Sequence, residues 1–223
     1  MPAEEALQQD TVIVVAGGGS PHAGAPLPDG AFVVAADEGI DRALALGLRV
    51  DLAVGDFDSA SPAAVEAALA TGTRIERHPA AKDATDLELA LDAAIALGPR
   101  RVVVLGGAGG RLDHLFAGML GLGSDRHAAV ELDAFLGPAT VHVVRGERRL
   151  SGQEGELISL LALHGRAEGV TTEGLLYPLN GETLEPGSSR GVSNVFAAPM
   201  ARISIERGVL LAIRPGLERK EAK

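Results

Sequence analysis

The sequence predicts an α/β protein in which an open, mostly parallel sheet with helices on both faces is followed by a smaller antiparallel β domain. Strand and helix signals alternate through the first half of the chain, and repeated β-loop-α units produce such a sheet. Within them, Arg101–Leu105 carries consecutive valines, a run typical of a strand that is covered on both faces. After about residue 127, short strand signals separated by turn residues replace the helix period. We therefore expect an α/β domain at residues 1–127 and a β-rich domain at residues 128–223.

Apolar, β-branched runs predict the strands of the first domain, whereas capping residues and apolar periodicity predict its helices. The strands expected in chain order are Thr11–Ala16, Ala31–Ala36, Leu52–Val54, Arg74–Arg77 and Arg101–Leu105. The helices expected among them are Glu38–Leu46, Pro62 to about Ala70, Asp83–Leu97 and about Leu112–Leu122. Gly47 ends the first helix, and Ser61 followed by Pro62 has the pattern of an N-cap and a first helical residue. The third helix has the clearest apolar stripe, with Leu87 and Leu91 on one face.

Short strands are expected throughout the second domain. They are Val130–Phe135, Thr140–Val144, Leu157–Leu163, Arg202–Glu206 and Val209–Ile213. Turn signals punctuate this half, at Gly137-Pro138, Asn180-Gly181, Pro186-Gly187 and Arg207-Gly208. Because no strong helix period is present, the strands are expected to pair with one another in antiparallel fashion.

Charge and composition exclude several classes of function. The net charge of -10 disfavours binding to nucleic acid or to an anionic membrane, because phosphate backbones and headgroups require a basic surface. The chain has no cysteine, which excludes disulfides and thiolate metal sites. The N-terminus is acidic and the apolar run Val12–Ala16 is too short to span a bilayer or to serve as an export signal. We expect a cytoplasmic protein.

Acidic side chains recur where the predicted strands end and the helices begin. They are Asp37, the pair Asp56 and Asp58, the pair Asp83 and Asp86, and Asp113. Each group alone has an ordinary explanation in turn formation or helix capping, such as Asp83 as an N-cap with Asp86 in the first turn. Together they fall on the carboxyl edge of one sheet, where ligands of open α/β folds bind. Crowded carboxylates require a hard cation, so the pattern predicts a Mg²⁺ site suited to phosphoryl transfer.

Cations and glycines accompany these acids and fit a phosphate ligand. Lys82 precedes an expected helix N-terminus, which itself favours anions. The glycine-rich stretch 106–110 follows the valine strand, and its Gly109 and Gly110 can let backbone amides approach a phosphate. Arg111 comes next and can donate two parallel hydrogen bonds to phosphate oxygens. A loop that merely needs glycine conformations is an equally good explanation of the glycines alone.

The order and spacing of these motifs resemble the thiamin pyrophosphokinase family. The motifs are Gly55–Ser59, Lys82–Glu88, Gly109–His114 and, toward the C-terminus, Tyr177-Pro178-Leu179 and Gly191-Val192-Ser193-Asn194. The likeness extends from about Val12 to Ile213. It implies a catalytic α/β domain followed by a β-sandwich-like domain, and a homodimer.

The resemblance also implies an activity and roles for single residues. Such enzymes move the pyrophosphoryl group of ATP onto the hydroxyethyl oxygen of thiamin and release thiamin diphosphate and AMP. By that likeness, the Mg²⁺ ligands are Asp56, Asp58 and Asp86. The nucleotide and its phosphates are expected to contact Asp37, Lys82, Asp83, Gly109, Gly110, Arg111 and Asp113. Thiamin is expected near Ser193 and Asn194, with Tyr177 as a candidate for stacking on its pyrimidine.

Alternatives remain open at this point. The carboxylate that takes the proton of the thiamin hydroxyl is either Asp86 or Asp113. The acceptor could be another small heterocyclic alcohol, such as a pterin, because the acidic edge would look the same. A non-catalytic dimer that binds nucleotide or thiamin is a third possibility, which the complete set of acidic residues argues against.

Overall fold

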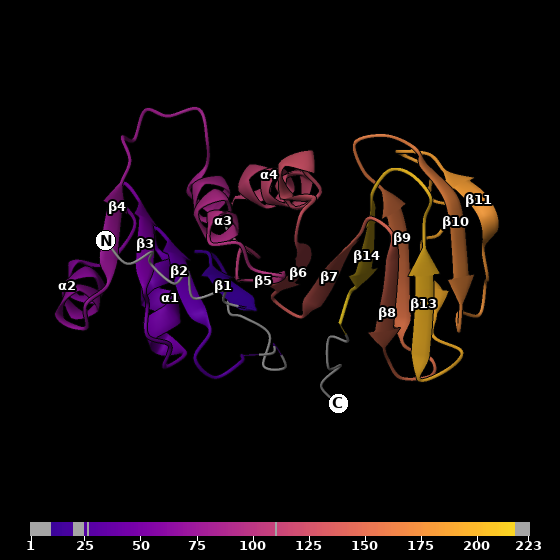
Figure 1. Cartoon of the computed structure of the whole chain (residues 1–223), viewed down its shortest axis with the longest axis horizontal. Coiled ribbons are helices and arrows are strands. Elements are labelled where there is room, and N and C mark those ends of the chain that lie inside the picture. The colour runs from indigo at the N-terminus through magenta and orange to yellow at the C-terminus, as the bar shows by residue number, and fades with distance from the viewer. Residues whose placement is uncertain (1–9, 20–24, 26, 110, 217–223) are drawn as a thin grey trace, which may run out of the picture. The chain divides into compact units, whose positions relative to one another are not determined.

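The computed structural model describes residues 10–19, 25, 27–109 and 111–216 (Figure 1). The chain forms two compact units, the first made of residues 1–118 and 129–137 and the second of residues 119–128 and 138–223. No helix among the described residues is both long enough and apolar enough to cross a membrane.

The first unit is built on a parallel sheet. Its strands are β1 (Thr11–Val15), β2 (Phe32–Ala36), β3 (Leu52–Gly55), β4 (Arg74–Arg77), β5 (Arg101–Leu105) and β6 (Glu131–Leu136). They lie in the order β6-β5-β1-β2-β3-β4, and every neighbouring pair is parallel. The last four residues of β1, β2 and β5 are buried, as expected for strands that are covered on both faces.

Helices cover both faces of this sheet, as predicted. They are α1 (Gly39–Ala45), α2 (Pro62–Ala70) and α3 (Asp86–Ala96), whereas α4 (Leu112–Leu122) follows β5 and has Leu122 as its buried residue. In Figure 1, α3 lies on one side of the sheet and α1 on the other, with α2 beside α1. Residues at alternate strand positions, such as Ile13, Val33 and Val103, form a core with Ile40 of α1 and Ala68 of α2.

The caps explain where two of these helices begin. The hydroxyl of Ser61 accepts a hydrogen bond from the backbone N–H of Ala64, which confirms it as the N-cap of α2. The prediction that α3 begins near Asp83 is wrong. Its N-cap is Thr85, whose hydroxyl accepts from the N–H of Glu88, so Asp83 lies in the preceding turn and Asp86 is the first helical residue.

One predicted strand belongs to a different sheet from the one expected. The run near residues 130–135 was expected to pair in the antiparallel second half. It forms β6, which follows α4 and pairs with β5 in parallel, from Arg101 opposite Glu131 to Leu105 opposite Phe135. A strand signal alone does not specify its partner, and here the intervening helix makes β5-α4-β6 a parallel crossover unit.

The second unit contains two antiparallel sheets. Its strands are β7 (Ala139–Val144), β8 (Glu147–Ser151), β9 (Leu157–Ala162), β10 (Ala167–Glu173), β11 (Asn180–Leu184), β12 (Asn194–Val195), β13 (Met200–Ser204) and β14 (Leu210–Arg214), and a short 3₁₀ helix occupies Asp125–His127. One sheet has the order β12-β9-β14-β7 and the other β11-β10-β13-β8. The antiparallel β domain of the prediction is therefore confirmed.

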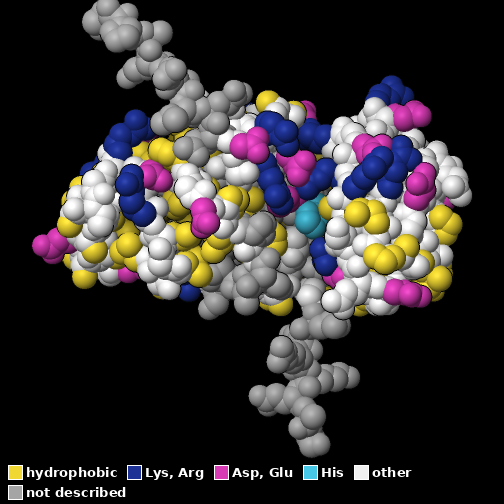
Figure 2. All heavy atoms as spheres, turned by 60° about the horizontal axis from the view of Figure 1, so that its bottom comes forward, with side chains coloured by type: hydrophobic (Ala, Val, Ile, Leu, Met, Phe, Trp, Pro, Cys, Tyr) yellow, Lys and Arg dark blue, Asp and Glu magenta, His cyan; other side chains and the backbone are white. Residues whose placement is uncertain are grey.

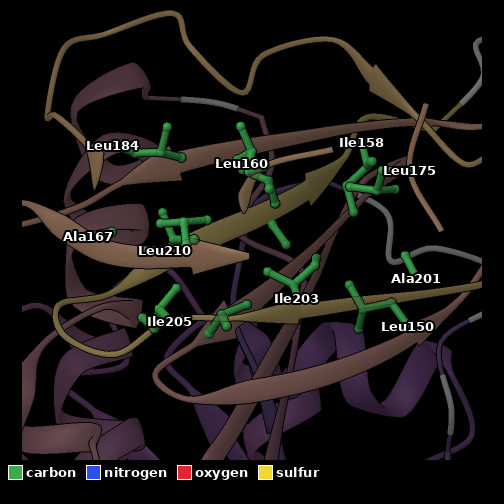
Figure 3. Packing of buried hydrophobic residues seen from close by; sticks show 14 of the residues in the cluster. Leu150, Ile158, Leu160, Ala167, Leu175, Leu184, Ala201, Ile203, Ile205 and Leu210 are labelled. Carbon is green, nitrogen blue, oxygen red and sulfur yellow. The ribbon is translucent and has the colours of Figure 1, made fainter. Parts of the chain in front are cut away.

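Buried side chains from both of these sheets meet in one core. Figure 3 shows Ile158, Leu160 and Leu210 of the first sheet together with Leu184 and Ile203 of the second. Two sheets that enclose a shared apolar layer form a sandwich, as the family resemblance implied. In Figure 2 the surface carries charges of both signs, with Lys and Arg side chains interspersed among Asp and Glu. In the second unit, for example, Arg202 pairs with both Glu147 and Glu173.

Candidate active site

The carboxyl ends of β2 and β3 bring two predicted acidic residues together. Asp37 follows β2 directly, and Asp56 follows β3 directly. The two strands are parallel neighbours, and the N–H of Asp37 donates to the carbonyl of Val54 at 2.9 Å. Asp37 has φ of 45°, an uncommon conformation for a residue other than glycine. This backbone conformation is held at the strand end, where it turns the chain into α1.

Residues 55–59, here called the acidic loop, complete a cluster of carboxylates. Phe57 has φ of 64°, and the N–H of Asp58 donates to Oδ1 of Asp56 at 3.1 Å. This turn gathers Asp37, Asp56 and Asp58, and one carboxylate oxygen of each lies within 4.8 Å of those of the other two. We call these three residues the acidic cluster. Among the residues that the structure describes, it is the one group of acidic or histidine side chains that fits a metal ion.

Lys82 and Asp86 lie at the border of the acidic cluster. The ammonium of Lys82 is 2.7 Å from Oδ1 of Asp86 and 3.5 Å from Oδ2 of Asp56. Gly55 permits this close approach, because a Cβ there would lie 3.1 Å from Oδ1 of Asp86 and 3.2 Å from Cβ of Asp37. The predicted ligand Asp86 therefore reaches the same place as Asp37 and Asp56. In this structure it is paired with a cation of the protein.

The electrostatics of the acidic cluster differ from one carboxylate to the next. Burial raises the pKa of Asp37, and the nearby charge of Asp86 raises it further. The N–H of Asp58 holds the pKa of Asp56 below its ordinary value, and Lys82 acts in the same direction. Oδ1 of Asp37 is buried and accepts no hydrogen bond. A buried carboxylate oxygen without a partner, beside other carboxylates, is the arrangement that a hard divalent cation satisfies.

The glycine loops that follow β1 and β5 meet at the carboxyl edge of the sheet, where the acidic cluster also lies. The N–H of Gly107 donates to the carbonyls of Gly17 and Gly18 at 2.8 and 2.9 Å. A Cβ on Gly19 would lie 1.7 Å from the carbonyl oxygen of Ala108, so the two loops are packed without room for a side chain. β1 lies between β2 and β5, which makes this the point where the strand order reverses and where ligands of such sheets bind. Gly109 has φ of 104°, and the predicted Gly110 lies outside the described residues.

Arg111 and Asp113 lie at the start of α4 and pair with each other. Nε and Nη2 of Arg111 donate to the two oxygens of Asp113 at 3.1 and 2.6 Å, and both side chains are exposed. This bidentate contact lowers the pKa of Asp113 to about 2. Asp83 is also exposed.

The predicted thiamin residues lie in the second unit. Ser193 is exposed with φ of 57°, and its N–H donates to the hydroxyl of Ser159. Asn194 is buried, and its side chain accepts a hydrogen bond from the N–H of Tyr177 and donates one to the carbonyl of the same residue. The ring of Tyr177 is exposed. The structure brings Asn194 and Tyr177 into contact, although they are separated by 17 positions in the sequence.

Sequence reasoning missed one cation at the acidic loop. The guanidinium of Arg77, the last residue of β4, lies over the ring of Phe57 at 5.0 Å from its centroid. Its Nη1 also donates to the carbonyl of Asp56 at 3.3 Å. The available signal was its position, because β4 ends at the same edge of the parallel sheet as β3. Asp37, which was predicted to contact the nucleotide, lies in one cluster with Asp56 and Asp58.

Comparison with protein families assigns both units. A model described as the catalytic domain of thiamin pyrophosphokinase matches residues 27–130, and a model of the vitamin B1 binding domain of thiamin pyrophosphokinase matches residues 140–210. The chain belongs to the thiamin pyrophosphokinase family. The catalytic-domain match contains the whole acidic cluster together with Lys82, Asp86 and Arg111, and the vitamin B1 match contains Tyr177, Ser193 and Asn194.

Relatives in the thiamin pyrophosphokinase family support both the sequence and the fold assignment. Thiamine pyrophosphokinase of Bacillus subtilis (strain 168) is 27% identical over 183 residues, which cover 81% of this chain and 86% of the relative. A solved thiamin pyrophosphokinase family protein from Enterococcus faecalis has a TM-score of 0.78 at 27% identity, over 92% of this chain and 98% of that one. A solved Bacillus subtilis thiamine pyrophosphokinase has a TM-score of 0.80 at 24% identity, over 93% and 99% of the chains, and shows the same fold. The chain is therefore an enzyme of this family, whose activity is the diphosphorylation of thiamin.

Proposed function

We propose that this chain transfers the pyrophosphoryl group of ATP to the hydroxyethyl oxygen of thiamin in a Mg²⁺-dependent reaction that releases AMP. The observation that carries the proposal is the acidic cluster. One carboxylate oxygen of each residue lies within 4.8 Å of those of the other two, and Oδ1 of Asp37 is buried without a hydrogen bond. Such a site fits Mg²⁺, which prefers oxygen ligands and accompanies triphosphates in phosphoryl transfer. The family membership supplies the substrates.

Two sets of residues would hold the metal ion. Asp37, Asp56 and Asp58 already share one small volume. We also retain Asp86 as a ligand, because the same Lys82 ammonium contacts it and Asp56. When bound, Mg²⁺ would neutralise charge on the phosphates and thereby favour attack at phosphorus.

Lys82, Arg111 and the glycine loops would bind the triphosphate. A phosphate oxygen competes with Asp86 for the Lys82 ammonium, so nucleotide binding would release the Asp86 carboxylate. Arg111 would exchange Asp113 for phosphate in the same way. Asp83 precedes the N-terminus of α3 and Gly109 comes after β5, and we retain both as phosphate contacts together with Gly110. Because an alcohol is a weak nucleophile, alignment and charge neutralisation by these groups would supply most of the rate enhancement.

The proton of the thiamin hydroxyl requires an acceptor, and the structure favours Asp86 over Asp113. Asp113 is exposed at the start of α4, where it pairs with Arg111. Asp86 lies next to the acidic cluster and would be free once Lys82 turns to phosphate. We propose that one oxygen of Asp86 binds the ion and that its other oxygen accepts the proton.

The remaining proposals concern organisation. We propose that residues 1–127 carry the nucleotide and Mg²⁺ site and that residues 128–223 carry the thiamin site and the dimer contacts. The enzyme would act as a cytoplasmic homodimer, as the family resemblance implies. Nucleic acid and membranes are not proposed as partners, in view of the net charge of -10.

One assay tests the function: release of AMP from ATP, with and without thiamin, in Mg²⁺ and in EDTA. We expect AMP and thiamin diphosphate in equal amounts, only when thiamin and Mg²⁺ are both present. AMP formed with a pterin alcohol but not with thiamin would show that the acceptor is another heterocyclic alcohol. Binding of ATP or thiamin without any AMP would support the non-catalytic dimer instead, and either result contradicts the proposal.

A further inference from the structure

The side chain of Asn194 is almost entirely used by its own protein. Its Oδ1 accepts from the N–H of Tyr177 at 3.0 Å and from the N–H of Val195 at 2.8 Å. Its Nδ2 donates to the carbonyl of Tyr177 at 2.7 Å. A side-chain amide has two acceptor positions and two donor hydrogens, so three of its four positions are occupied. With only 3% of Asn194 exposed, little of it is accessible to a small molecule.

The same contacts fix the backbone of Tyr177. The amide of Asn194 bonds to both the N–H and the carbonyl of this residue, as a neighbouring strand would. On one side, the N–H of Leu176 donates to the carbonyl of Val195 at 2.8 Å. On the other side, Pro178 restricts the conformation of Tyr177, since a residue before proline avoids the helical region. The backbone at Tyr177 is thus held on both sides.

The ring carried by this fixed backbone is 60% exposed. Leu176, its neighbour in the chain, is also exposed, and so is Leu157, which pairs with Val195 across β9 and β12. An exposed aromatic ring on a rigid backbone loses little conformational entropy when a flat, cationic ligand stacks on it. Thiamin has this character, with a pyrimidine ring and a positively charged thiazolium ring.

We propose that Asn194 is a positioning residue that holds Tyr177, and that the Tyr177 ring is the surface on which thiamin stacks. This inference rests on the proposed function, because it assigns the ligand to thiamin. It revises the expectation that Asn194 contacts thiamin directly. Asn194 acts on the ligand only through the ring that it holds.

A double-mutant cycle separates a positioning role from a direct contact. Tyr177→Leu should raise the KM for thiamin about tenfold, or about 1.4 kcal/mol, through loss of the stacking ring. Tyr177→Phe keeps the ring and should stay near wild type. Asn194→Ala should also raise the thiamin KM, with kcat and the KM for ATP nearly unchanged. The double variant Tyr177→Leu/Asn194→Ala should be no worse than Tyr177→Leu alone, whereas additive losses would overturn the proposal.

The sequence offers a second readout that needs no substrate. The chain has one Tyr and no Trp, so the fluorescence of the whole protein reports on Tyr177. Asn194→Ala should lower the fluorescence anisotropy of the ligand-free protein, because the ring gains freedom. The exposed Asn180→Ala is the matched control and should leave both anisotropy and KM unchanged. Unchanged anisotropy in Asn194→Ala would overturn the positioning role.

Further variants keep the test decisive. If Asn194→Ala does not fold, Asn194→Asp replaces it in the same cycle, because it keeps the acceptor oxygen and puts a second acceptor in place of the donor to the Tyr177 carbonyl. Failure of the proposed function gives a different result. In that case wild-type protein releases no AMP with thiamin, while the anisotropy of Asn194→Ala still decides whether Asn194 holds Tyr177.

Discussion

The acidic cluster predicts that Asp58→Asn has opposite effects on the melting temperature in the absence and in the presence of Mg²⁺. Asp58→Asn keeps the shape of the side chain and an oxygen ligand but removes one of three gathered carboxylate charges. Without metal, the variant loses a like-charge neighbour of Asp37 and Asp56, so its melting temperature should equal or exceed that of wild type. With saturating Mg²⁺, the order should reverse, because the variant binds the ion less tightly.

The size of the reversal follows from linkage. At a Mg²⁺ concentration 100 times Kd, wild type should gain about 2.7 kcal/mol. If removal of one ligand charge weakens binding about tenfold, the same concentration gives the variant about 1.4 kcal/mol. At about 4 °C per kcal/mol for a domain of this size, Mg²⁺ would raise the melting temperature by about 11 °C in wild type and about 6 °C in Asp58→Asn. Turnover should fall by about 100-fold or more, because charge on the transferring phosphates is less well compensated.

Differential scanning fluorimetry over a Mg²⁺ series measures these shifts, with thiamin-dependent AMP release alongside. The control is Asp29→Asn, an exposed aspartate away from the cluster that changes the net charge by the same amount. It should show the wild-type Mg²⁺ shift and wild-type turnover. If Asp58→Asn also behaves like wild type in both assays, Asp58 is no metal ligand and the cluster is an ordinary turn.

Three further predictions address the surroundings of the cluster. Arg111 lowers the pKa of Asp113 to about 2, so their pairing stabilises the fold at pH values above 3.8 and is lost as the pH falls through about 2. Arg111→Ala should return this pKa toward 3.8, which carboxyl ¹³C NMR measures, and an unchanged pKa would contradict the pairing. Gly19→Ala should destabilise the fold by more than 2 kcal/mol, or about 8 °C in thermal unfolding, because its Cβ would meet a backbone carbonyl oxygen at 1.7 Å. The control Gly30→Ala has a similar φ of +74° but open space around its Cβ, and should cost only about 1 kcal/mol. Equal losses of stability in the two variants would argue against the contact of the glycine loops. Arg77→Met should lower kcat about threefold to tenfold by freeing the acidic loop, with partial recovery in Arg77→Lys, whereas full activity in Arg77→Met would show that the loop needs no such support.

The first unit could be predicted in detail because its signals are local and repeated. The strands Arg74–Arg77 and Arg101–Leu105 and the helix Leu112–Leu122 are found at the predicted residues. Alternation of strand and helix implies parallel pairing, and parallel pairing places all carboxyl ends at one edge. The start of α3 was misplaced because two acids and a threonine within four positions can all cap a helix, and only the backbone shows that Thr85 does so.

The second unit was harder to predict because its strands lack a complete apolar pattern. β8 (Glu147–Ser151) has one buried residue, and β11 (Asn180–Leu184) begins at a pair that was interpreted as a turn. β10 and the two-residue β12 were not predicted either. An antiparallel strand with one solvent-exposed face carries fewer apolar residues than a parallel strand that is covered on both faces. Its sequence pattern is therefore difficult to distinguish from that of a loop.

The same contrast explains which functional contacts the sequence could show. The acids of the cluster were found because each stands next to a strong strand signal, and the sheet converts that position into proximity. The contact between Asn194 and Tyr177 has no such rule behind it, since it joins an edge strand to an irregular segment 17 residues away. A motif of Ser and Asn near a ligand suggests direct binding, and only the hydrogen bonds reveal that the amide is already occupied. Where a polar side chain is buried, its partners in the fold therefore have to be counted before it is assigned to a substrate.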